Sequence, residues 1–141
     1  MKQNKRTLLL GIYEFILSIG AVYIGIMMIS SKGVFDEFPV EWIDKLPFRS
    51  WNPLGIIAIL VFGAGNFLSA LFVFLRLKTK LLRMSALMGI LFLVCVITQR
   101  FILGEWYLAT SQLLILSIIQ VILCAFVFLG YRDNNNFKKI M

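Results

Sequence analysis

The sequence predicts an all-α integral membrane protein, a four-helix bundle in up-down-up-down order. Of its 141 residues, 60% are hydrophobic and only 15% are charged, whereas soluble domains are about half apolar and about a quarter charged. Four apolar runs are long enough to cross a bilayer. They lie at about residues 8–29, 54–75, 84–103 and 110–131. We therefore expect one transmembrane domain over residues 1–141.

The first run, residues 8–29, contains Glu14, and no other predicted span contains an acid. As a helix the run would be roughly 33 Å long, enough to cross the hydrocarbon core. Basic residues precede it, as they do in a signal peptide. However, the run is longer than a signal's apolar region, and no clean cleavage site follows it. We therefore expect a retained span.

Residues 30–53 form the one long connection and mix charged with aromatic residues. Pro39 suits the first turn of a short helix. We predict that Val40–Leu46 is a short interfacial amphipathic helix, with Trp42 and Trp51 anchored among the lipid headgroups. Two interpretations stay open, a surface loop with aromatic anchors or a lid over a site between the helices.

The remaining connections are short. Pro53 suits the first turn of the second span, because its missing N–H is not needed there. The link at 76–83 holds four basic residues and no acid, and the link at 104–109 holds Trp106, a third predicted interfacial anchor. We expect the polar tail at 132–141 to be frayed.

The basic residues predict the orientation. The N-terminal tail, the 76–83 link and the C-terminal tail hold ten Lys or Arg, whereas the two opposite loops hold three against five acids. Positive residues favour the cytoplasmic side, so both termini are expected there in a multi-pass protein of the cell membrane.

The net charge is +7, but the basic residues lie at the helix ends rather than in one patch, so we expect no nucleic-acid binding. The expected partners are the lipid bilayer and a membrane-protein partner or a second copy in a homodimer.

An acid inside a membrane span costs about 2.5–3.5 kcal/mol on insertion scales and suggests function by default. Counting residues along the helices puts Glu14 about 9 Å and Asn66 about 14 Å from the cytoplasmic edge. We predict an inner polar cluster that comprises Glu14, Ser18, Asn66, Ser69 and Gln120. It either hydrogen-bonds the helices together or handles a proton, a cation or another ligand.

Other chemistry is limited. Arg100 and Glu105 are predicted to form an ion pair at the outer edge, with a headgroup or anion site as the alternative. There is no His, and Cys95 and Cys124 form no CxxC pair, which excludes a His-based metal site and a CxxC thiol oxidase. No nucleophile–base pair or phosphate loop can be assembled. We therefore expect no enzyme activity, no catalytic residue, no metal and no cofactor.

Several stretches resemble an uncharacterised group of small four-helix bacterial membrane proteins. They are the Gly-rich first span, FPVEWIDKLPFRSWNPLG (38–55), FGAGN (62–66) and ITQRFILGEW (97–106). This resemblance covers most of the chain and implies the fold but no activity. The acid in the first span also resembles the essential helix-1 glutamate of the small multidrug resistance transporters, which act as dimers. Glu14 would match that glutamate, but the family's Trp and Tyr pattern in helices 2 and 3 is missing and this outer loop is far longer.

These observations favour a small, non-catalytic accessory or interaction protein of the cell membrane. The alternative is a proton-coupled exporter of small molecules or cations that acts as a dimer around Glu14. The two differ in whether Glu14 must exchange a proton for a substrate or only accept hydrogen bonds.

Overall fold

The computed structural model describes residues 2–104 and 108–140, and these residues form helices and turns without a β-strand. Four helical segments are long and apolar enough to cross a membrane. They are Lys5–Ser30, Asn52–Phe74, Lys78–Leu103 and Ser111–Gly130. Each overlaps one of the four predicted runs. The chain is therefore all-helical, and its helices indicate a multi-pass membrane protein.

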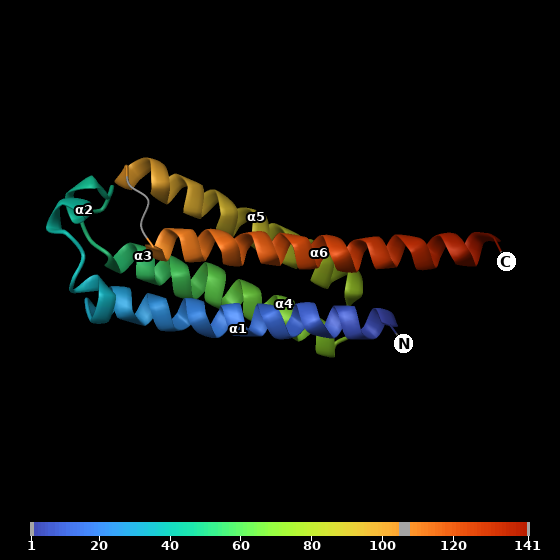
Figure 1. Cartoon of the computed structure of the whole chain (residues 1–141). Coiled ribbons are helices and arrows are strands. Elements are labelled where there is room, and N and C mark those ends of the chain that lie inside the picture. The colour runs from blue at the N-terminus through green and yellow to red at the C-terminus, as the bar shows by residue number, and fades with distance from the viewer. Residues whose placement is uncertain (1, 105–107, 141) are drawn as a thin grey trace.

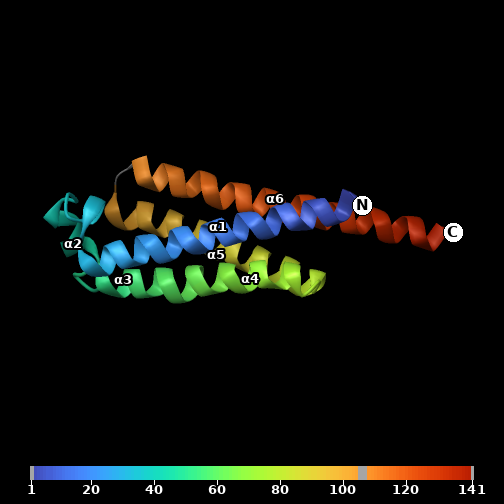
Figure 2. The same cartoon turned by 90° about the horizontal axis from the view of Figure 1, so that it is seen from below.

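The elements follow one another in a simple order. They are α1 (Lys2–Ser30), η1 (Gly33–Phe35), α2 (Val40–Lys45), α3 (Asn52–Ile57), η2 (Ala58–Gly63), α4 (Ala64–Phe74), α5 (Lys78–Leu103) and α6 (Leu108–Ile140). α3, η2 and α4 form one rod, in which η2 is a π-helical segment that the sequence did not predict. The two ends of the chain lie at one end of the bundle and α2 at the other (Figures 1 and 2).

Three helices are longer than expected. α1 begins at Lys2 rather than near residue 8. α5 begins at Lys78 rather than near residue 84, and α6 continues to Ile140 through the segment expected to fray. Figure 1 shows α6 projecting beyond the other helices toward the C-terminus. Adding a residue to an existing helix is far easier than nucleating one, and no proline follows Gly130 to stop it.

Glycines bring α1 close to the rod formed by α3, η2 and α4. A Cβ added to Gly25 would lie 2.7 Å from the Gly55 carbonyl oxygen, and a Cβ added to Gly55 would lie 2.7 Å from the Gly25 carbonyl oxygen. Toward the termini, Gly11 leaves room for the Val73 side chain of α4, which an added Cβ would meet. α1 therefore lies along the whole length of the rod, as both views show.

An aromatic cluster covers the end of the bundle near α2. Trp42 and Trp51, predicted as interfacial anchors, are only 5% and 7% exposed and pack with Leu46 and Leu103. Their indoles therefore face protein, and membrane anchoring by them stays a prediction. Lys45 Nζ also donates a 3.0 Å hydrogen bond to the Leu103 carbonyl, which joins α2 to the end of α5. Trp106, the third predicted anchor, lies outside the described residues.

Candidate functional site

Glu14 lies on α1 with none of its surface exposed. One carboxylate oxygen, Oε2, accepts a 3.0 Å hydrogen bond from Gln120 Nε2 on α6. The other, Oε1, accepts a hydrogen bond from the Ser85 hydroxyl on α5. Both oxygens therefore have a donor, and the carboxylate connects three helices.

Gln120 extends this network to α4. Its Nε2 also donates a 3.0 Å hydrogen bond to Asn66 Oδ1 on α4, and both side chains are buried. A primary amide nitrogen has two N–H groups, so this nitrogen is fully used. Glu14, Gln120 and Asn66 thus form one hydrogen-bonded chain that runs from α1 through α6 to α4.

Two predicted members of the inner polar cluster lie nearby without bonding to Glu14. Ser18, one turn along α1, donates a 2.7 Å hydrogen bond to the carbonyl of Gly63, the last residue of η2. Ser69, one turn from Asn66 on α4, is fully buried. Within the described part of the chain, its hydroxyl and Gln120 Oε1 are buried without a hydrogen-bond partner.

Ser85 was not among the predicted site residues, although it donates directly to Glu14. A serine within a span is a weak signal, because its hydroxyl commonly bonds to its own helix, as that of Ser117 does to the Leu114 carbonyl. Ser85 lies four residues after Leu81, which is also fully buried, so both face the interior of the bundle. That spacing was the available signal.

An apolar layer separates the inner polar cluster from the end of the bundle that carries the termini. Leu10, Leu81 and Val127 form it, each at most 2% exposed. Leu10 lies one turn before Glu14 on α1, and Leu81 lies one turn before Ser85 on α5. The layer therefore covers the carboxylate from that end.

Arg6 is the basic residue closest to Glu14 along α1. Arg6, about two turns earlier on α1, places its guanidinium 4.1 Å from the centre of the Phe126 ring, a cation–π contact. Among the described residues, no group of three His, Cys, Asp or Glu side chains could hold a metal ion. Chemically, the arrangement suits strong hydrogen bonding between helices, since it supplies donors to both carboxylate oxygens.

The predicted outer pair is only half described. Arg100 lies in the last turn of α5 and is partly buried. Glu105 lies outside the described residues, so the ion pair stays a prediction.

The chain was also compared with known proteins. No protein-family model, curated protein or solved structure matched it.

Proposed function

We propose that this chain is a non-catalytic accessory or interaction protein of the cell membrane. Its four spans would cross in up-down-up-down order with both termini cytoplasmic, and Val40–Leu46 would lie in the outer interface. The ten basic residues of the two tails and the 76–83 link support this orientation. So does the position of the two chain ends at one end of the bundle (Figure 1).

The observation that carries the proposal is the enclosure of Glu14. An acid that works on a ligand or a proton must be reachable by that ligand or by water. Glu14 has no exposed surface, and both of its oxygens accept hydrogen bonds from the same chain. The apolar layer of Leu10, Leu81 and Val127 covers one side of it. Such an acid supports a structural role, in which it selects one arrangement of the helices.

The exporter remains a second candidate because of two buried oxygens. Ser69 Oγ and Gln120 Oε1 lack a hydrogen-bond partner within the described residues, and oxygens of this kind could receive a proton donor, a water or a cation. Against it, a dimeric exporter would need Glu14 where two subunits meet, whereas the partners of Glu14 come from its own chain.

Transport is tested in proteoliposomes that contain a pH-sensitive dye and are challenged with tetraphenylphosphonium as a lipophilic cation. We expect wild type, Glu14→Gln and protein-free vesicles to show the same proton movement. Cation-driven proton movement that Glu14→Gln abolishes, in a variant that still folds, would establish the exporter instead.

The accessory function is tested in native membranes. A tagged chain is crosslinked in the cell and analysed by native electrophoresis and mass spectrometry. Wild type and Glu14→Gln should both occur in one complex that contains the same second protein and is larger than the 16.1 kDa chain. Migration of the chain alone, in several mild detergents and after crosslinking, would contradict the proposal.

The orientation has its own test in intact cells, with Cys95 and Cys124 replaced by serine. A cysteine introduced at Lys45 should react with a membrane-impermeant thiol reagent, whereas one at Lys80 should react only after lysis. The opposite pattern would overturn the orientation.

A further inference from the structure

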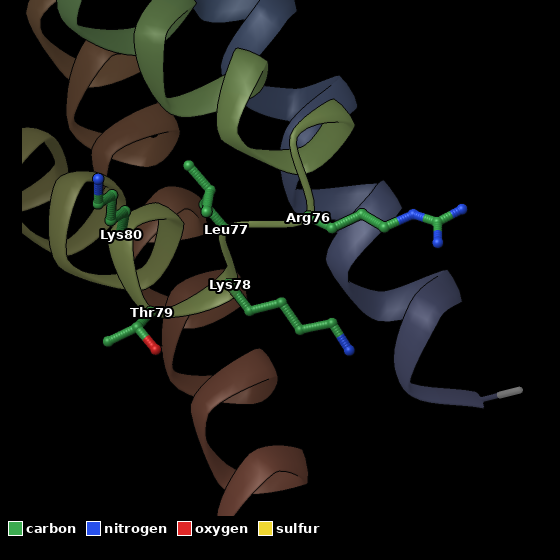
Figure 3. A pocket seen from close by; sticks show the side chains of 5 residues that line it. All are labelled: Arg76, Leu77, Lys78, Thr79 and Lys80. Carbon is green, nitrogen blue, oxygen red and sulfur yellow. The ribbon is translucent and has the colours of Figure 1, made fainter.

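A cleft of about 340 Å³ opens at the turn between α4 and α5. It is lined by Arg76, Leu77, Lys78, Thr79 and Lys80. Figure 3 shows the Arg76 and Lys78 side chains extending to the same side of the turn, whereas Lys80 lies on the other side. Residues 46–104 contain no Asp or Glu, so every charge that α4 and α5 contribute to this turn is positive.

The backbone of this turn would suit glycine better than arginine. Arg76 N–H bonds to the Val73 carbonyl at 3.1 Å and Leu77 N–H to the Phe72 carbonyl at 3.0 Å, the pattern of a Schellman motif. Arg76 occupies its left-handed position with φ +55°, which glycine adopts without steric cost. The chain thus keeps a guanidinium at the cleft although the backbone conformation disfavours it.

Apolar side chains flank the cations. Phe74 is 76% exposed and Leu75 is 54% exposed, and both directly precede the cleft. Leu77, which lies between Arg76 and Lys78, is also exposed. Cations beside exposed apolar side chains suit a phosphate group that is attached to hydrocarbon chains better than they suit a free phosphate ion.

We propose that this cleft binds the phosphate group of an anionic phospholipid, whose acyl chains lie against Phe74 and Leu75. The Arg76 guanidinium can hold two phosphate oxygens at once, and the Lys78 ammonium adds a second positive charge. A free phosphate ion has the same chemistry, and the experiment below separates the two sources. Only the assignment to the cytoplasmic leaflet rests on the proposed orientation.

The test uses the full chain in nanodiscs of phosphatidylcholine and phosphatidylglycerol in equal amounts. Native mass spectrometry measures the ratio of the two lipids that stay bound. Wild type should retain phosphatidylglycerol selectively, and Arg76→Gln/Lys78→Gln should lose about 30-fold of that selectivity, as expected for two basic side chains at a membrane surface. Lys32→Gln/Arg49→Gln removes the same charges near α2 and is the matched control, expected to keep the selectivity.

A second variant keeps the proposal falsifiable if the double variant fails to fold. Arg76→Gly should fold at least as well as wild type, because it relieves the left-handed residue, and should still lose selectivity. Equal retention of the two lipids by wild type, or equal losses in the test and control pairs, would overturn the site.

The source of the phosphate is tested in neutral detergent by thermal unfolding with inorganic phosphate. Little stabilisation of wild type, together with selectivity in nanodiscs, supports the lipid. Stabilisation that is lost in Arg76→Gln/Lys78→Gln, without selectivity in nanodiscs, would overturn the lipid in favour of the free ion. Because a nanodisc presents both lipids to both ends of the bundle, failure here leaves the proposed orientation and the accessory function untouched.

Discussion

Gln120 donates a 3.0 Å hydrogen bond to Glu14, from which it is separated by 106 residues. The bond joins the last span to the first. It also continues to Asn66, so one amide nitrogen links α1, α6 and α4. Hydrogen bonds between membrane helices contribute about 0.6–2 kcal/mol each, so this amide is a central contact of the bundle.

Replacing Gln120 with leucine should therefore destabilise the protein by about 1–3 kcal/mol, because Glu14 and Asn66 each lose a buried donor. The measurement is unfolding of the purified protein in mixed micelles with increasing dodecyl sulfate. Gln112→Leu, an exposed position on the same helix, is the matched control and should change stability by less than about 0.5 kcal/mol. Equal effects at the two positions would mean that the bond contributes little.

Much of this site could be predicted from residue type and depth alone. Glu14, Asn66 and Gln120 are strongly polar residues within apolar runs, and counting residues from the helix ends placed Glu14 and Asn66 about 9 Å and about 14 Å from the same edge. Ser85 could not be found in this way, since its role depends on which face of α5 meets α1. The absence of bonds from Ser18 and Ser69 to Glu14 likewise depends on side-chain packing that depth does not specify.

The contact between Gly25 and Gly55 gives a second prediction. In Gly25→Ala the added methyl would meet the Gly55 carbonyl oxygen and the Ile59 side chain, so α1 must move away from the rod. We expect a loss of about 1–3 kcal/mol in the same unfolding assay. Gly20→Ala places a methyl on the same helix with nothing within 4 Å, and should leave stability unchanged or raise it by up to about 1 kcal/mol. A destabilising Gly20→Ala with a neutral Gly25→Ala would contradict this packing.

The π-helical segment η2 gives a third prediction. A π turn contains one residue more than an α turn, so deleting exposed Leu60 should convert η2 to α-helix while the flanking contacts remain. Deleting exposed Phe67 from α4 instead should rotate buried Ser69, and Val73 that packs beside Gly11, by about 100° out of the interior. We expect the Leu60 deletion to be purified as a folded monodisperse protein and the Phe67 deletion to aggregate. Aggregation of both would show that η2 cannot close into an α turn.

The sequence predicted the four spans because each is a long apolar run, but it did not predict where the helical geometry changes. η2 ends at Gly63, where an added Cβ would lie 2.8 Å from the Val22 side chain of α1, so the helical geometry changes at a place where two helices pack closely. The length of α6 was missed for another reason. Its polar residues after 131 suggest fraying, but they extend a helix that the apolar span has already nucleated.

The enclosure of Glu14 is tested most directly with a hydrophobic carbodiimide, which reacts with carboxyl groups that it can reach from the apolar phase. The protein is treated in lipid bilayers, and modification of Glu14 is measured by peptide mass spectrometry, with Glu14→Gln as the control for labelling elsewhere. We predict that Glu14 stays unmodified in the folded protein and reacts after unfolding in dodecyl sulfate, because its surface is fully covered by its own chain. Rapid, complete labelling of folded protein, which a lipophilic cation prevents, would show an open carboxyl and contradict the structural role of Glu14.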